Sequence, residues 1–79
     1  MRIFNDEADC KLDSVTLFLT ERELRQLISY ARQLIERPLA DHHHLSSEDY
    51  QKEITICIYN EEDSSNFSTR AQKLIKEDR

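Results

Sequence analysis

The sequence Thr20-Glu21-Arg22-Glu23 is typical of the first turn of a helix. The Thr20 hydroxyl can accept a hydrogen bond from the Glu23 amide, while the Glu23 carboxylate accepts one from the Thr20 amide. We therefore predict a helix that begins after Thr20 and is ended by Pro38, which disfavours helical geometry in the residue before it. Its apolar residues recur at steps of three and four, as helical packing requires: Leu24, Leu27, Ile28, Ala31, Leu34 and Ile35.

Two segments, Ser14–Thr20 and Glu53–Asn60, alternate between apolar and other residues, as half-buried strands do. The short arm His42–Leu45 precedes the second segment, and the polar connection Ser46–Lys52 joins the two into a predicted hairpin. Arg2–Phe4 is a candidate edge strand. The residues predicted to face the core are Val15, Leu17 and Leu19 in the first segment and Ile54, Ile56 and Ile58 in the second.

Near the C-terminus a second, shorter helix is predicted from Phe67, Ala71, Leu74 and Ile75, with an N-cap from Ser64, Ser65 or Asn66. The whole order is β-α-β-β-α, and it predicts one small α+β domain over residues 1–79. The predicted sheet has three strands and is mixed, because the first strand reaches Glu53–Asn60 through a right-handed crossover. Both helices are predicted on one face of this two-layer domain.

Composition narrows the possible functions. The chain has 79 residues, a net charge of −5 and no glycine, so glycine-rich nucleotide loops are excluded. Its mostly acidic surface would repel phosphate backbones, and we predict no nucleic-acid partner. No apolar stretch is long enough to span a bilayer and no secretory signal is evident, so we expect a cytoplasmic protein without membrane contact. Cys10 and Cys57 are expected to be reduced thiols.

The uncovered face of the predicted sheet is the first candidate site. Phe18 and Tyr59, on neighbouring strands, would form an aromatic anchor for a second copy or another protein. The alternative is a solvated polar face with two tolerated aromatic residues. An acidic loop at a strand end could steer a cationic protein toward this site. The partner-binding candidates are Phe18, Tyr59, Cys57, Thr16, Glu61, Glu62 and Asp63.

The histidine run is the second candidate site. His42 and His44 would share one side of a strand and could bind zinc or nickel, with Asp41, Glu48 or Asp49 as third ligand. The alternative is a solvated polar loop, and we predict no cofactor. Cys57 with a histidine of the neighbouring arm is the one nucleophile–base pair that can be built, and a strand cysteine is more often inert.

The sequence therefore predicts a non-enzymatic protein-interaction module that forms a homodimer, or that binds and inhibits another protein. In size and acidity the chain is similar to small bacterial toxin-neutralising immunity proteins, a similarity of type rather than of a motif. The alternative function is a metal-binding or metal-dependent domain built on His42 and His44.

Overall fold

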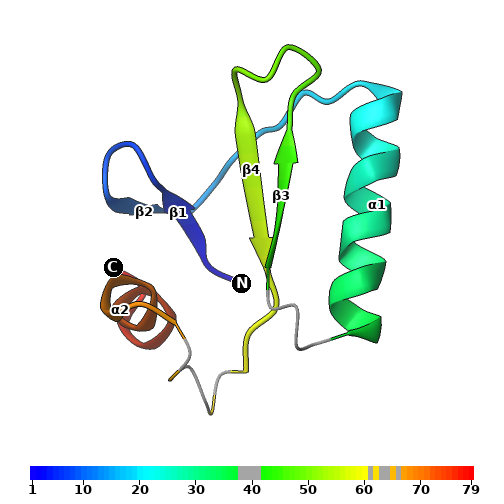
Figure 1. The fold of residues 1–79 in the computed structure, drawn as a ribbon. Helices are drawn as coiled ribbons and strands as arrows, with labels where there is room; N and C mark the ends of the chain where they lie inside the picture. The colour runs from blue at the N-terminus through cyan, green and yellow to red at the C-terminus, as the bar shows by residue number, and fades with distance from the viewer. Residues whose placement is uncertain (38–41, 61, 63–64, 66) are drawn as a thin grey trace. The chain divides into compact units, whose positions relative to one another are not determined.

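The structure, a computed structural model, describes residues 1–37, 42–60, 62, 65 and 67–79. Over these residues it is an α+β protein with two helices and two antiparallel sheets of two strands each, which confirms the predicted class (Figure 1). The chain divides into two compact units, Phe18–Ile58 and the combination of Met1–Leu17 with Tyr59–Arg79. The elements are β1 (Ile3–Asn5), β2 (Cys10–Leu12), α1 (Glu21–Glu36), β3 (His42–Ser46), β4 (Glu53–Cys57) and α2 (Thr69–Glu77).

Helix α1 begins with the predicted capping box. The Glu23 amide donates to the Thr20 hydroxyl at 3.1 Å, and the Thr20 amide donates to Glu23 Oε1 at 2.9 Å. Glu23 Oε2 accepts a further hydrogen bond from the Glu48 amide at 3.0 Å, in the loop between β3 and β4. The Thr20 and Glu48 amides together hold the pKa of the Glu23 carboxyl below its ordinary value. One carboxylate thus joins the helix start to the hairpin.

Only one side of the predicted apolar stripe of α1 is covered. Leu34 is buried, and Leu27 and Ala31 are part-buried. The helix ends at Glu36, where the Arg37 amide donates to the Gln33 carbonyl at 2.8 Å and the Arg37 backbone leaves helical geometry. Such a departure is expected in the residue before a proline. Pro38 itself lies outside the described residues.

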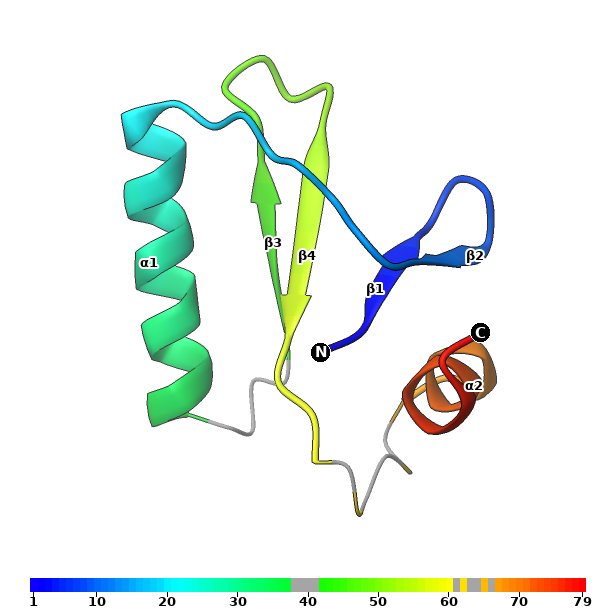
Figure 2. The same cartoon turned by 180° about the vertical axis from the view of Figure 1, so that it is seen from behind.

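Strands β3 and β4 form the predicted hairpin, beside α1 in both views of the unit (Figures 1 and 2). Leu45 pairs with Ile54 and His43 with Ile56, and all four are buried or part-buried. The His43 ring stacks on Tyr30 of α1 with centroids 4.9 Å apart, so this face of the hairpin packs on the helix. Strand β4 ends at Cys57, three residues earlier than predicted.

In the other unit, β1 pairs with β2 across a loop in which Asn5 Oδ1 accepts from the amides of Glu7 and Ala8. Asp9 supplies the positive φ of 52° that glycine more often provides. The edge strand suggested at Arg2–Phe4 therefore exists, one residue later, as β1. Its partner β2 is a strand that the sequence pattern did not predict.

Helix α2 is confirmed, but its cap is Ser68, whose hydroxyl accepts from the Ala71 amide at 3.1 Å. The prediction of a cap at Ser64, Ser65 or Asn66 is wrong, because the first turn starts at Thr69 rather than at Phe67. Its apolar stripe is as expected, with Leu74 buried and Phe67, Ala71 and Ile75 part-buried.

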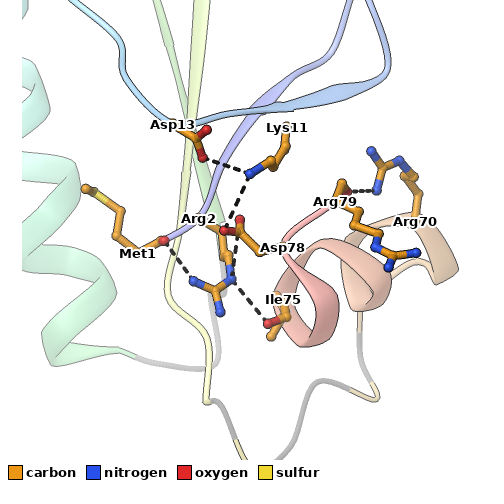
Figure 3. Close-up of polar contacts among 8 residues, drawn as sticks. All are labelled: Met1, Arg2, Lys11, Asp13, Arg70, Ile75, Asp78 and Arg79. Atoms are coloured by element: carbon orange, nitrogen blue, oxygen red, sulfur yellow. Dashed lines mark hydrogen bonds and ion pairs between the residues drawn. The ribbon is translucent and has the colours of Figure 1, made fainter.

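Charged side chains fasten α2 to the β1–β2 hairpin (Figure 3). Arg2 donates to the Ile75 carbonyl at 3.2 Å and lies 3.9 Å from Asp78, while Lys11 lies 3.9 Å from the other Asp78 oxygen. Arg70, from the first turn of α2, places its guanidinium 4.6 Å from the Phe4 ring centre. It also pairs with Asp9 at 3.2 Å and donates to the Arg79 carbonyl. Both ends of α2 are thereby held.

The prediction of a strand over Ser14–Thr20 is wrong. None of these residues belongs to a strand, and Val15 and Leu17 are each 49% exposed. Alternation supplies the side-chain period of a strand, but a strand also needs a neighbouring backbone to pair with. The three-stranded mixed sheet is absent from the described residues, and α1 packs on β3–β4 while α2 contacts β1–β2. Each helix is thus seen to contact the strands of its own unit.

The cap predicts a measurable contribution to stability. Thr20→Ala removes the acceptor of the Glu23 amide and should cost about 1 kcal/mol of unfolding free energy, whereas Thr20→Ser keeps the oxygen and should cost much less. Urea denaturation followed by circular dichroism measures both. Equal midpoints for Thr20→Ala and the parent would contradict the role of the cap.

Acid should destabilise the protein through its hairpin loop. The pKa of Glu23 and that of Asp49 are both lowered, the latter by hydrogen bonds from the Ser47 hydroxyl and the Gln51 amide. Their stabilisation is present above the ordinary carboxyl pKa and is lost as pH falls through the lowered values, that is, below about pH 4. Urea midpoints measured from pH 7 to pH 2 should therefore fall less steeply for Glu23→Gln than for the parent.

The matched control is Glu21→Gln, which removes an equal charge from the same helix turn but only breaks the exposed pair with Arg25. Its pH profile should follow that of the parent. Parallel profiles for the parent and Glu23→Gln would show that the carboxylate bridge does not contribute.

Candidate functional site

The face of the β3–β4 hairpin directed away from α1 gathers polar and reactive side chains. We call it the open face, and every residue on it is exposed. Strand alternation places it opposite the packing face that carries His43 and Leu45. Its residues are His42, His44, Ser46, Glu53, Thr55 and Cys57.

His44 is held in one orientation on the open face. Its Nδ1 lies 2.6 Å from Glu53 Oε1 and 2.8 Å from Thr55 Oγ1. Because an ionised carboxylate only accepts hydrogen bonds, Nδ1 carries the proton in this contact. In the neutral ring Nε2 is then the nitrogen with the lone pair, and it can bind a proton or a metal ion.

His42 and His44 share a side of β3, as predicted, and their ring centroids are 5.1 Å apart. The proposed third metal ligands are not found. Asp41 lies outside the described residues, and Asp49 accepts hydrogen bonds from Ser47 and Gln51 in the hairpin loop. In the described part of the chain, no three His, Cys, Asp or Glu residues gather to hold a metal ion. Neither Glu48 nor Asp49 therefore joins His42 and His44 in such a group.

Cys57 is exposed on the open face, as predicted, and pairs directly with His42 across the two strands. The hairpin thus brings together the one nucleophile–base pair that the sequence allowed. The carboxylate that could orient a base contacts His44 rather than His42.

Glu53 is a residue of this face that sequence reasoning missed, and its Oε1 lies 2.6 Å from His44 Nδ1. The available signal was strand alternation: Glu53 lies two residues from Thr55 and four from Cys57, on the side already assigned as open.

A second surface lies on α1 itself. Leu24, Ile28 and Ile35, which we call the α1 strip, are 46%, 52% and 72% exposed. The sequence pattern placed all three in the core. The helix carries two adjacent apolar seams, and the hairpin covers only the one that contains Leu27 and Leu34.

The predicted aromatic anchor is not formed by neighbouring strands. Phe18 is 95% exposed and Tyr59 is part-buried, but neither residue lies in a strand and they belong to different units. Thr16 and Glu62 are exposed. Glu61 and Asp63, the other members of the predicted acidic loop, lie outside the described residues.

Comparisons of the chain with protein-family models, with curated proteins and with solved structures each found no match. Within the part that the structure describes, neither helix has the length and apolar character needed to cross a membrane.

The stacked His43 gives a test of the hairpin packing beneath the open face. Its Nε2 is buried and has no hydrogen-bond partner among the described residues, and an unpartnered buried nitrogen is unfavourable. His43→Phe keeps a ring on Tyr30 and removes that nitrogen, so the melting temperature should stay the same or rise. His43→Ala loses the stack and should lower it. A fall for His43→Phe as large as that for His43→Ala would contradict this packing.

Proposed function

We propose that this protein is a non-enzymatic interaction module that forms a homodimer through the α1 strip. The observation that carries the proposal is the exposed apolar seam, three large side chains along one side of a helix whose other side packs on β3–β4. Scattered exposed apolar residues are common, but several large ones along one side of a helix are typical of a surface that a partner covers.

The spacing of this seam favours a second copy as the partner. The α1 strip and the part-buried Ala31 at its edge, that is Leu24, Ile28, Ala31 and Ile35, follow steps of four, three and four, the spacing of helices that pack side by side. The order of the steps reads the same in both directions. Two antiparallel copies of α1 would therefore set Leu24 of one copy against Ile35 of the other, and Ile28 against Ala31. The two-fold axis repeats each pair, and the whole contact is about 16 Å long.

The thin core supports the same proposal. In the described residues, the buried apolar side chains are Leu34 and Leu45 in one unit and Leu74 in the other. Small domains are marginally stable because they bury little apolar surface, and covering three further large side chains would add to it. The exposed thiols of Cys10 and Cys57 suit a reducing compartment, and we place the module in the cytoplasm.

The alternative proposal is that the interaction module binds a different protein rather than a second copy of itself. The net charge of −5 favours a cationic partner, and Phe18, almost fully exposed just before α1, would extend the apolar contact. An inhibitor of a basic toxin would have these properties.

The dimer is tested by placing a charge in the middle of the strip. Ile28→Glu should weaken self-association at least about tenfold, because truncated interface anchors typically cost more than 1 kcal/mol and the two-fold contact contains the residue twice. The fold should persist, since the Ile28 side chain is half exposed within one chain. Sedimentation equilibrium gives the dissociation constants, and circular dichroism verifies the fold.

Gln26→Glu is the matched control, because it adds the same charge at an exposed position of the same helix away from the strip. It should associate like the parent. A parent that stays monomeric at high concentration would overturn the dimer, as would equal association constants for Ile28→Glu and Gln26→Glu.

A further inference from the structure

We propose that the open face is half of a zinc site, and that one Zn²⁺ bridges two copies of the chain through His42 and His44 of each. This inference goes beyond the α1 dimer and does not require it, because it uses a different surface of the same unit.

The spacing of the two imidazoles is the first support. Zinc binds histidine nitrogen at about 2.0–2.1 Å in tetrahedral geometry, which puts the centres of two ligating rings about 5 Å apart. The centroids of His42 and His44 are 5.1 Å apart, and both side chains project from the same exposed face of β3. The strand therefore already holds the two rings at the separation that one shared metal ion requires.

The contact between Glu53 and His44 is the second support. Histidines that bind metal usually donate their other ring N–H to a carboxylate, which fixes the tautomer and makes the ligating nitrogen more basic. Glu53 accepts from His44 Nδ1 at 2.6 Å, and the Thr55 hydroxyl lies 2.8 Å from the same nitrogen. In the neutral ring this leaves the lone pair on Nε2. The open face therefore supplies two imidazole ligands, His42 and His44, and a carboxylate, Glu53, that accepts a hydrogen bond from one of them.

The need for a second copy follows from the ligand count. A structural zinc ion takes four ligands, and no cluster of three candidate ligands exists within the described residues. Two open faces related by a two-fold axis would supply four imidazoles. The site is exposed on the side of the β3–β4 hairpin opposite His43 and Leu45, so two such faces can approach without rearranging the packed side.

Cys57 provides a way to distinguish this site from a thiolate site. It lies directly across from His42, and thiolates also bind zinc well. In the proposed bridge the four ligands are imidazoles, so Cys57→Ser should leave zinc affinity unchanged. Cobalt substituted for zinc should accordingly show tetrahedral absorption without a sulfur-to-metal charge-transfer band.

The experiment uses the full chain carrying Ile28→Glu, so that association through α1 does not obscure the zinc effect. Chelator-treated protein is titrated with zinc chloride at about pH 7.5, while calorimetry counts the bound ions and sedimentation measures the mass of the complex. We expect roughly half a zinc ion per chain and a dimer that chelator dissociates. His42→Gln and His44→Gln should each abolish the dimer, and Glu53→Gln should weaken zinc binding about 10- to 100-fold.

Each other result overturns the bridge. One zinc ion per monomeric chain would mean that a single chain completes the site, and binding only at millimolar zinc would mean an adventitious ion only. Zinc binding that survives His42→Gln and His44→Gln would place the metal elsewhere. The α1 dimer is tested separately with the parent protein in the presence of chelator. If the parent is then a monomer, the α1 dimer is overturned, while the zinc titration of Ile28→Glu still tests the zinc bridge.

Discussion

The carboxylate of Glu23 sets the arrangement of the helix–hairpin unit. One of its oxygens accepts from the Thr20 amide at the helix start and the other from the Glu48 amide in the hairpin loop. A local capping interaction is thereby turned into a contact between segments 25 residues apart in sequence. The capping box alone would form in an isolated helix, whereas the second oxygen connects the helix start to the hairpin loop.

Glu23 lies on the side of α1 that packs on the hairpin. Leu27, Tyr30 and Leu34 follow Glu23 at helical steps on the same side, and they are the residues that the hairpin covers. The α1 strip lies on the adjacent side. Because the helix has apolar residues on two adjacent sides and one hairpin to cover them, the residues of the α1 strip stay exposed.

Local signals in the sequence predicted local structure well. The cap at Thr20, the end of α1 before Pro38 and the β3–β4 hairpin depend on neighbouring residues, and all three are present. The strand over Ser14–Thr20 failed because pairing depends on a distant backbone that periodicity does not report. Contacts between distant segments also limit what the sequence predicts about the candidate binding surfaces. Alternation predicted that His42 and His44 share a side, but the Glu53 contact and the exposure of Ile28 arise only when separate segments pack.

Three consecutive histidines show how the packed side of the hairpin organises its open side. The period of two along β3 sends His43 inward, where it stacks on Tyr30, and sends His42 and His44 outward. The stack of His43 on Tyr30 and the buried Leu45 pack the inner side of β3 on α1, and the outer pair projects from the same strand. Ligands fixed before binding lose less conformational entropy when a metal ion arrives. The inner histidine thus contributes to any binding at the outer two without touching the ligand.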